Sequence, residues 1–240
     1  MRISARLWLE NIELLIQKAR RRRLRKIVEI AITDLDLMNR FVDLTSSVMF
    51  EHEHLKEARP FKSRADLYRY LVNELDTGDG LHLEFGVYKG DSINRLAGLN
   101  PRLHWYGFDS FVGLPEMWTL GARKGAFDVA GKLPAVRDNV TLIKGFFEET
   151  LPPFVAQHRG SKVAVVNIDC DLCSATKTVL QNLKPMLQPN SIIVFDELIN
   201  YPGWQDGEYK AFMEYVREEQ LTFAYVGYVR TGSQVAVKLL

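Results

Sequence analysis

The chain has 240 residues and a mass of 27.6 kDa, which suits one large α/β domain with an appendage and is short for two ordinary domains. Hydrophobic residues make up 47% of it and charged residues 25%, proportions that exclude a disordered or low-complexity chain. The 31 basic and 30 acidic side chains leave a net charge of +1, so any attraction to nucleic acid or to an anionic membrane must be local.

Cysteine usage and hydropathy bear on the compartment. The two cysteines, Cys170 and Cys173, lie in one short segment, whereas the cysteines of a disulfide framework are spread along a chain. No run reaches the roughly 18 apolar residues of a membrane-spanning helix, and the N-terminus lacks the apolar core and cleavage site of a secretory leader. We therefore expect a cytoplasmic protein without a transmembrane segment.

Residues 1–62 are expected to form a helical extension that serves in dimerisation or as a lid. Apolar residues recur there at helical spacing, first from Leu7 to Ile16 and again from Leu24 to Ala31. Between these two sets lies a basic cluster from Arg20 to Lys26. It can touch an anionic surface such as phosphate or lipid, or it can be the solvated face of a helix beside a dimer contact.

From residue 63 onward the pattern predicts alternating strands and helices. A first helix over 65–75 is capped by Ser63 or Asp66. Seven strands are expected at 81–85, 103–108, 140–143, 163–168, 191–195, 222–229 and 234–239, the last two paired as a hairpin. Further helices are expected at 91–99, 175–187 and 207–219. This order is typical of a doubly wound α/β domain with a mostly parallel sheet and an antiparallel last strand.

Ligands of such sheets bind beyond the carboxyl ends of the strands, and two features at these ends indicate a nucleoside site. Gly86 and Gly90 follow the first strand and allow a tight turn into a helix whose first N–H groups are free. Asp109 ends the next strand, where a carboxylate can accept hydrogen bonds from the two hydroxyls of a ribose. The dinucleotide fingerprint and the phosphate-cradling lysine loop are both absent from the sequence, so S-adenosylmethionine fits best.

The motifs at the strand ends resemble the macrocin O-methyltransferase family of class I S-adenosylmethionine-dependent enzymes. The resemblance covers roughly residues 63–240 and implies a Rossmann-like methyltransferase domain there. Five segments carry it in order: Leu83-Glu84-Phe85-Gly86-Val87-Tyr88-Lys89-Gly90-Asp91-Ser92, Gly107-Phe108-Asp109-Ser110-Phe111-Val112-Gly113-Leu114-Pro115, Gly145-Phe146-Phe147-Glu148-Glu149-Thr150-Leu151-Pro152, Ile168-Asp169-Cys170-Asp171-Leu172 and Val194-Phe195-Asp196-Glu197.

The resemblance also implies where the cofactor binds. The Gly86 backbone and the Ser92 hydroxyl would hold the methionine moiety, Asp109 the ribose, and the segment that begins Gly145-Phe146 would border the adenine. The full set of expected cofactor-binding residues is Glu84, Gly86, Tyr88, Ser92, Asp109, Ser110, Gly145, Phe146 and Asp169.

Three carboxylates, Asp169, Asp196 and Glu197, match the metal-binding strand ends of the same family. Neighbouring carboxylates repel one another unless they are protonated or neutralised by a cation, and Mg²⁺ prefers oxygen ligands. Bound magnesium would lower the pKa of a substrate hydroxyl, and Asp169 would accept its proton as the catalytic base. Glu197 departs from the family's second aspartate, and Cys173 from its tyrosine, which leaves Cys170 and Cys173 in the spacing of a redox pair.

The sequence thus predicts an S-adenosylmethionine-dependent, Mg²⁺-dependent O-methyltransferase that acts as a homodimer on a hydroxyl of a sugar or related small molecule. The irregular segment 118–138 is expected to form a lid that sets acceptor specificity. Two alternatives remain: a metal-independent N- or O-methyltransferase on another acceptor, including RNA or a lipid-linked one, and a non-catalytic nucleoside-binding module.

Overall fold

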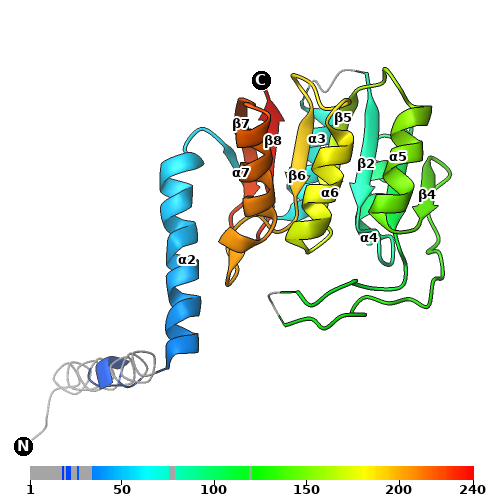
Figure 1. Cartoon of the computed structure of the whole chain (residues 1–240). Helices are drawn as coiled ribbons and strands as arrows, with labels where there is room; N and C mark the ends of the chain where they lie inside the picture. Colours follow the sequence, from blue (N-terminus) through cyan, green and yellow to red (C-terminus); the bar gives the residue numbers. More distant parts are fainter. Residues whose placement is uncertain (1–17, 19, 23–25, 27–33, 76–78, 119–120) are drawn as a thin grey trace, which may run out of the picture.

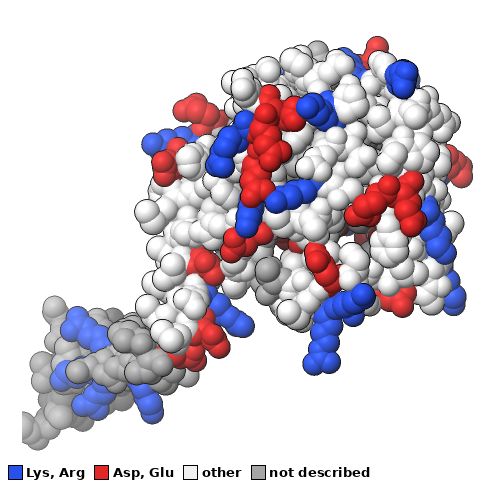
Figure 2. Space-filling model, viewed as in Figure 1, with Lys and Arg blue, Asp and Glu red and all other residues white. Residues whose placement is uncertain are grey.

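The computed structural model describes residues 18, 20–22, 26, 34–75, 79–118 and 121–240. Four members of the basic cluster, Arg20, Arg21, Arg22 and Lys26, are described and exposed. The rest of that cluster lies outside the described residues, as do both apolar sets expected between Leu7 and Ala31. Figure 2 shows basic and acidic side chains interspersed over one face of the domain. No helix in the described part of the chain is both long and apolar enough to cross a bilayer.

A single sheet of eight strands forms the centre of the molecule, in the order β1-β7-β8-β6-β5-β2-β3-β4. All seven expected strands are present, as β2 (Leu81–Phe85), β3 (Trp105–Asp109), β4 (Val140–Lys144), β5 (Val163–Ile168), β6 (Ile192–Phe195), β7 (Phe223–Val229) and β8 (Val235–Leu239). β8 runs antiparallel to both of its neighbours, and the other pairs are parallel. The predicted doubly wound sheet with an antiparallel last strand is confirmed.

The eighth strand, β1 (Arg59–Phe61), comes from the segment that was expected to be helical. It pairs in parallel with β7 at one edge of the sheet, where Pro60 is tolerated. Phe61 packs into the core beneath α3 (Arg64–Asn73). Three residues are too few to show a period of two, which is why the pattern did not predict this strand.

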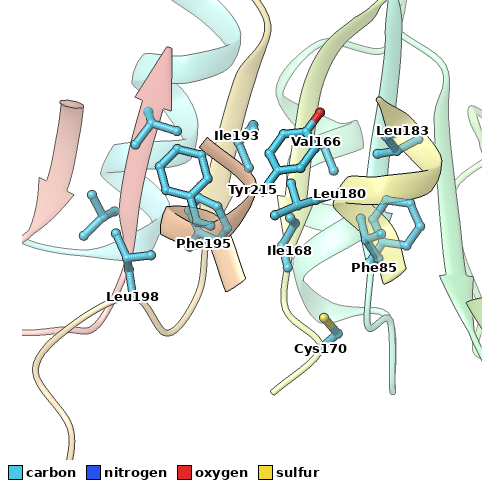
Figure 3. Packing of buried hydrophobic residues seen from close by; sticks show 14 of the residues in the cluster. Phe85, Val166, Ile168, Cys170, Leu180, Leu183, Ile193, Phe195, Leu198 and Tyr215 are labelled. Carbon is cyan, nitrogen blue, oxygen red and sulfur yellow. The ribbon is translucent and has the colours of Figure 1, made fainter. Parts of the chain in front are cut away.

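Helices cover both faces of the sheet (Figure 1). On one face α3, capped by Ser63 as predicted, packs beside α4 (Asp91–Leu99). The other face carries α5 (Phe147–Gln157), α6 (Cys173–Leu183) and α7 (Glu208–Glu218), preceded by the short 3-10 helix η1 (Trp204–Asp206). In this second layer Ile168 and Phe195 of the central strands pack with Leu180 of α6 and Tyr215 of α7 (Figure 3).

The sequence pattern did not predict α5, because Pro152 and Pro153 remove two backbone donors from its interior. The helix forms nevertheless because Leu151 and Phe154 are buried against the sheet. The Phe154 ring lies 5.0 Å from that of Phe108 on β3. Apolar burial therefore outweighs the two lost hydrogen bonds.

The helix α2 (Leu35–His54) begins at the N-cap Asp34 and lies beside α7 and β7 at the edge of the sheet (Figure 1). Its C-terminal half belongs to the domain. Phe50 packs on Trp204 with ring centroids 5.3 Å apart, and Ser46 accepts a 2.9 Å hydrogen bond from Trp204 Nε1. The outer face of the helix is apolar and exposed.

Candidate active site

A cavity of about 330 Å³ opens where the parallel strands end. The residues that follow β2, β3, β4, β5 and β6 line it, together with the N-terminus of α3 and the loop after β3. Eight of the expected cofactor-binding residues lie on its wall: Gly86, Tyr88, Ser92, Asp109, Ser110, Gly145, Phe146 and Asp169. The structure thus gathers in one place residues that the sequence spreads over more than 80 positions.

The loop after β2 is shaped by a close approach of two strands. Gly86 has a φ of 90°, and a Cβ atom there would lie 1.6 Å from the carbonyl oxygen of Asp169. Only glycine fits that position. Gly90, with a φ of 84°, forms the N-cap of α4, so the loop leads directly into the N-terminus of a helix.

Asp109 fixes the same loop from the side of β3. Its Oδ2 accepts hydrogen bonds from the backbone N–H groups of Val87 (2.8 Å) and Tyr88 (2.7 Å). Its Oδ1 accepts one from Phe111 (2.7 Å). These three bonds hold the carboxylate at the cavity wall and hold Tyr88 at a φ of 49°.

Glu84 differs from the other expected cofactor-binding residues, because its carboxyl is fully buried beneath the loop and does not line the cavity. Ser92 Oγ lies 2.9 Å from its Oε1, and Asn167 Nδ2 donates to its Oε2 at 3.2 Å. The Tyr68 hydroxyl donates in turn to Asn167 Oδ1 at 3.3 Å. Burial raises the pKa of Glu84 to about 8, so this carboxyl is mainly neutral at pH 7.

An acidic cluster forms another part of the cavity wall. Carboxylate oxygens of Asp169, Asp171 and Glu197 lie within 4.8 Å of one another. Burial, followed by the charge of Glu208, raises the pKa of Glu197 to about 11, and burial raises that of Asp171 to about 6. Burial and the neighbouring Asp196 also raise the pKa of Asp169. Such shifts mean that the three groups cannot all be charged without a counter-ion.

Asp171 was not among the expected site residues. The available signal was the Asp-x-Asp spacing of Asp169 and Asp171, which a strand would place on one face. The chain leaves β5 before Asp171, which has a φ of 62° and lines the cavity.

Nearby, Cys170 and Cys173 are free thiols, and burial raises the pKa of both.

Asp196 was expected to join Asp169 and Glu197, and the structure gives it a different partner. Its Oδ1 accepts hydrogen bonds from Arg64 Nη1 at 2.8 Å and from Gln234 Nε2 at 3.1 Å. Asp196 is 7% exposed, is absent from the cavity wall and is not part of the acidic cluster. The sequence pattern could not reveal this ion pair, because Arg64 lies 132 residues away.

Another buried carboxyl group, that of Glu208, contacts the acidic cluster. Glu208, at the start of α7, is fully buried and accepts a 3.0 Å hydrogen bond from the Glu197 backbone N–H. Two oxygens of this region, Glu197 Oε2 and Glu208 Oε1, have no hydrogen-bond partner among the described residues. A buried oxygen without a donor is costly, and a cation held by the cluster would satisfy Glu197 Oε2.

The loop after β3 closes one side of the cavity with Leu114, Trp118 and Phe127. Leu114 pairs with the Gly125–Ala126 segment through two 2.9 Å backbone hydrogen bonds. Glu116 accepts a 2.5 Å hydrogen bond from Ser174 Oγ at the start of α6. The segment expected to be a lid therefore lies beside the site.

Comparison with known proteins agrees with this arrangement. Residues 83–198 match the family described as a methyltransferase domain. The matched span includes the cofactor loop at Gly86 and the acidic residues Asp169 and Glu197. Over 163 residues, or 56% of the chain, it is 30% identical to the 8-demethyl-8-(2,3-dimethoxy-alpha-L-rhamnosyl)-tetracenomycin-C 4'-O-methyltransferase of Streptomyces olivaceus, and it spans 59% of that relative's length.

Two solved structures share the fold of this chain. CalS11, a calicheamicin methyltransferase, matches with a TM-score of 0.56 and 23% identity over 90% of each chain. The O-methyltransferase NovP matches with a TM-score of 0.53 and 21% identity over 73% of this chain and 78% of its own. The match to a methyltransferase domain supports S-adenosylmethionine as the cofactor expected from the sequence.

Glu84 makes the stability of the protein depend on pH. Its pKa rises from the ordinary 4.5 to about 8 on folding, so the folded chain holds a proton that the unfolded chain releases in this range. The free energy of unfolding therefore falls as pH rises from 5 to 8. We expect urea denaturation of Glu84→Gln to show a fall smaller by roughly 3 kcal/mol than that of the wild type. Glu57→Gln, at an exposed glutamate, is the control, and equal falls in wild type and Glu84→Gln would contradict the assignment.

Proposed function

We propose that this methyltransferase transfers the methyl group of S-adenosylmethionine to a hydroxyl of a sugar or related small molecule, with magnesium in the acidic cluster. The observation that carries the proposal is that Asp169, Asp171 and Glu197 lie on the wall of the same cavity as the cofactor loop. A cation ligand set beside a nucleoside site suits transfer to a hydroxyl. The names of the Streptomyces olivaceus relative and of NovP, both O-methyltransferases, favour the same chemistry.

The cofactor is proposed to bind along the loop after β2, with its ribose hydroxyls on Asp109 and its adenine against Phe146. Phe146 is 39% exposed and lines the cavity, so its ring is available for stacking. Gly86 would hold the methionine moiety through its backbone. Ser92 Oγ donates a 2.9 Å hydrogen bond to Glu84 Oε1, which orients the hydroxyl so that its lone pairs can accept from the amino group of the methionine moiety.

Removing the ribose acceptor tests this pose. Asp109→Ala is expected to weaken binding of S-adenosylhomocysteine by about 1.5–3 kcal/mol, the scale of a hydrogen bond to a charged group, in calorimetry. Asp109→Asn keeps an oxygen for the loop N–H groups and separates the loss of charge from the loss of loop geometry. Asp138→Ala, at an exposed aspartate, is the control. Unchanged affinity in Asp109→Ala, or a preference for a nicotinamide dinucleotide, would contradict the pose.

The acidic cluster fits magnesium through Asp169, Asp171 and Glu197. The longer side chain of Glu197 still brings an oxygen within 4.8 Å of the two aspartates, and its Oε2 lacks a donor. When bound, the ion would lower the pKa of an acceptor hydroxyl. Asp169 is proposed to accept the hydroxyl proton, because it is the member of the cluster whose backbone contacts the cofactor loop at Gly86. Asp171, from the same loop, is the alternative base.

Substitutions in the acidic cluster distinguish the residues that bind magnesium from the catalytic base. Asp169→Asn is expected to lower methyl transfer at least about 100-fold, the scale of lost general-base catalysis, with a much smaller change in cofactor affinity. Glu197→Gln is expected to raise the magnesium concentration needed for half-maximal activity, and a chelator should silence the wild type reversibly. Asp79→Asn, at an exposed aspartate that does not line the cavity, is the control. Full activity in excess chelator would favour the metal-independent alternative, and a larger loss in Asp171→Asn than in Asp169→Asn would move the base to Asp171.

The methyltransferase is further proposed to be a homodimer joined through α2. Four exposed apolar residues follow one another at spacings of four, three and four, namely Leu37 (41% exposed), Phe41 (64%), Leu44 (44%) and Val48 (52%). This is the seam of a two-helix coiled coil, and a second copy of α2 supplies a matching seam. The cytoplasmic location and a role of the basic cluster at an anionic surface stay predictions.

A charge placed in the seam tests the dimer. Phe41→Glu is expected to convert the protein to a monomer in sedimentation velocity, because two buried carboxylates would face each other across the interface. Asn39→Glu, on the opposite side of the same helix and exposed, should leave the dimer intact. A monomeric wild type, or a Phe41→Glu variant that stays dimeric, would contradict the assignment.

A further inference from the structure

Arg64 is a cationic side chain that lines the cavity beside the acidic cluster. It is the first residue of α3 and comes from outside the strand ends that carry the other site residues. Its Nη1 lies 2.8 Å from Asp196 Oδ1 and 3.4 Å from Asp169 Oδ2, so one guanidinium bridges the ends of β6 and β5. Its side chain is 39% exposed and lines the cavity.

Acidic side chains outnumber basic ones around Arg64. Four carboxyl groups, those of Asp169, Asp171, Asp196 and Glu197, follow two adjacent strands. The other basic residue on the cavity wall is Lys89, and its Nζ lies over the ring of Tyr88 at 4.9 Å. In the part of the chain that the structure describes, Arg64 is the cation that forms an ion pair with the cluster, through Asp169, and it also pairs with Asp196.

We infer that Arg64 is a positioning residue of the cation site, which withdraws Asp196 from the ligand set and competes with a divalent cation for Asp169. The inference rests on the proposed magnesium site. The 2.8 Å contact pairs Arg64 with Asp196, which also accepts from Gln234. The 3.4 Å contact reaches Asp169, one of the three residues that remain for the ion.

The pair has a consequence for metal affinity. Arg64 and Asp196 together are neutral, so the ion meets the charge of Asp169, Asp171 and Glu197. Without the guanidinium, Asp196 is a free carboxylate beside this cluster and Asp169 has no competing cation. Without Asp196, the full guanidinium charge faces Asp169. Replacing Arg64 by a neutral residue and replacing Asp196 by a neutral residue therefore change the metal affinity in opposite directions. Replacing both exchanges the neutral ion pair for two neutral side chains.

Binding of Mn²⁺ alone, followed by electron paramagnetic resonance of the free ion, measures this affinity without methyl transfer. Arg64→Gln is expected to bind Mn²⁺ at least about tenfold more tightly than the wild type, the scale of the Coulomb interaction between a dication and a neighbouring unit charge screened by water. Arg64→Lys keeps the charge and should stay within about threefold of the wild type. Asp196→Asn should bind at least about tenfold more weakly, and Arg64→Gln with Asp196→Asn should return to wild-type affinity.

Arg69→Gln is the matched control, because Arg69 lies on the same helix and pairs with Asp66 away from the cavity. It should leave the Mn²⁺ affinity unchanged. Arg64→Met, neutral and of similar length, takes the place of Arg64→Gln if circular dichroism shows that the glutamine variant is unfolded.

The outcomes separate the inference from the magnesium proposal. Wild-type affinity in Arg64→Gln, or a loss on Asp196→Asn that persists in the double variant, overturns the inference and leaves the metal site standing. Binding in Arg64→Gln without binding in the wild type supports the inference, since Arg64 alone then balances the cluster. Absence of binding in both overturns the inference together with the metal site.

Discussion

The close approach of β2 and β5 is the constraint on which the rest of the site depends. Gly86 packs directly on the backbone of Asp169, where even a Cβ atom would meet the carbonyl oxygen. Asp169 N–H donates to the carbonyl of Phe85, the last residue of β2, at 2.8 Å and extends the parallel pairing one residue past the end of β5. The cofactor loop and the acidic cluster are therefore neighbours because of backbone packing, and their side chains need only point into the space between them.

Polar groups beneath the cavity make this arrangement rigid. A buried chain of hydrogen bonds runs from Ser92 through Glu84 and Asn167 to Tyr68, and so joins α4, β2, β5 and α3. Each member of such a chain has few alternative partners in the interior, so the chain specifies one arrangement of the four elements. Arg64 lies one turn before Tyr68 on α3, with its guanidinium 5.9 Å from the Tyr68 ring. The cofactor side and the cation side of the cavity thus share one scaffold.

The sequence predicted the fold wherever local pattern and burial agree. Alternating strands and helices gave the doubly wound sheet and its antiparallel last strand, since β-branched runs and capping residues act locally. β1 was not predicted because it is held by pairing with β7, which follows it by more than 160 residues. α5 was not predicted because its prolines oppose a helix that burial of Leu151 and Phe154 imposes.

For the site, the sequence by itself determined which residues stand at the ends of the strands, among them Gly86, Asp109, Asp169 and Glu197, because a strand end is a local feature. Only the tertiary structure decided the partner of each carboxyl. Glu84 turns inward to Ser92 and Asn167, and Asp196 pairs with Arg64. Asp171 joins Glu197 and Asp169 instead. These choices depend on charges and hydrogen-bond donors that packing brings from distant parts of the chain, and periodicity along the sequence carries no record of them.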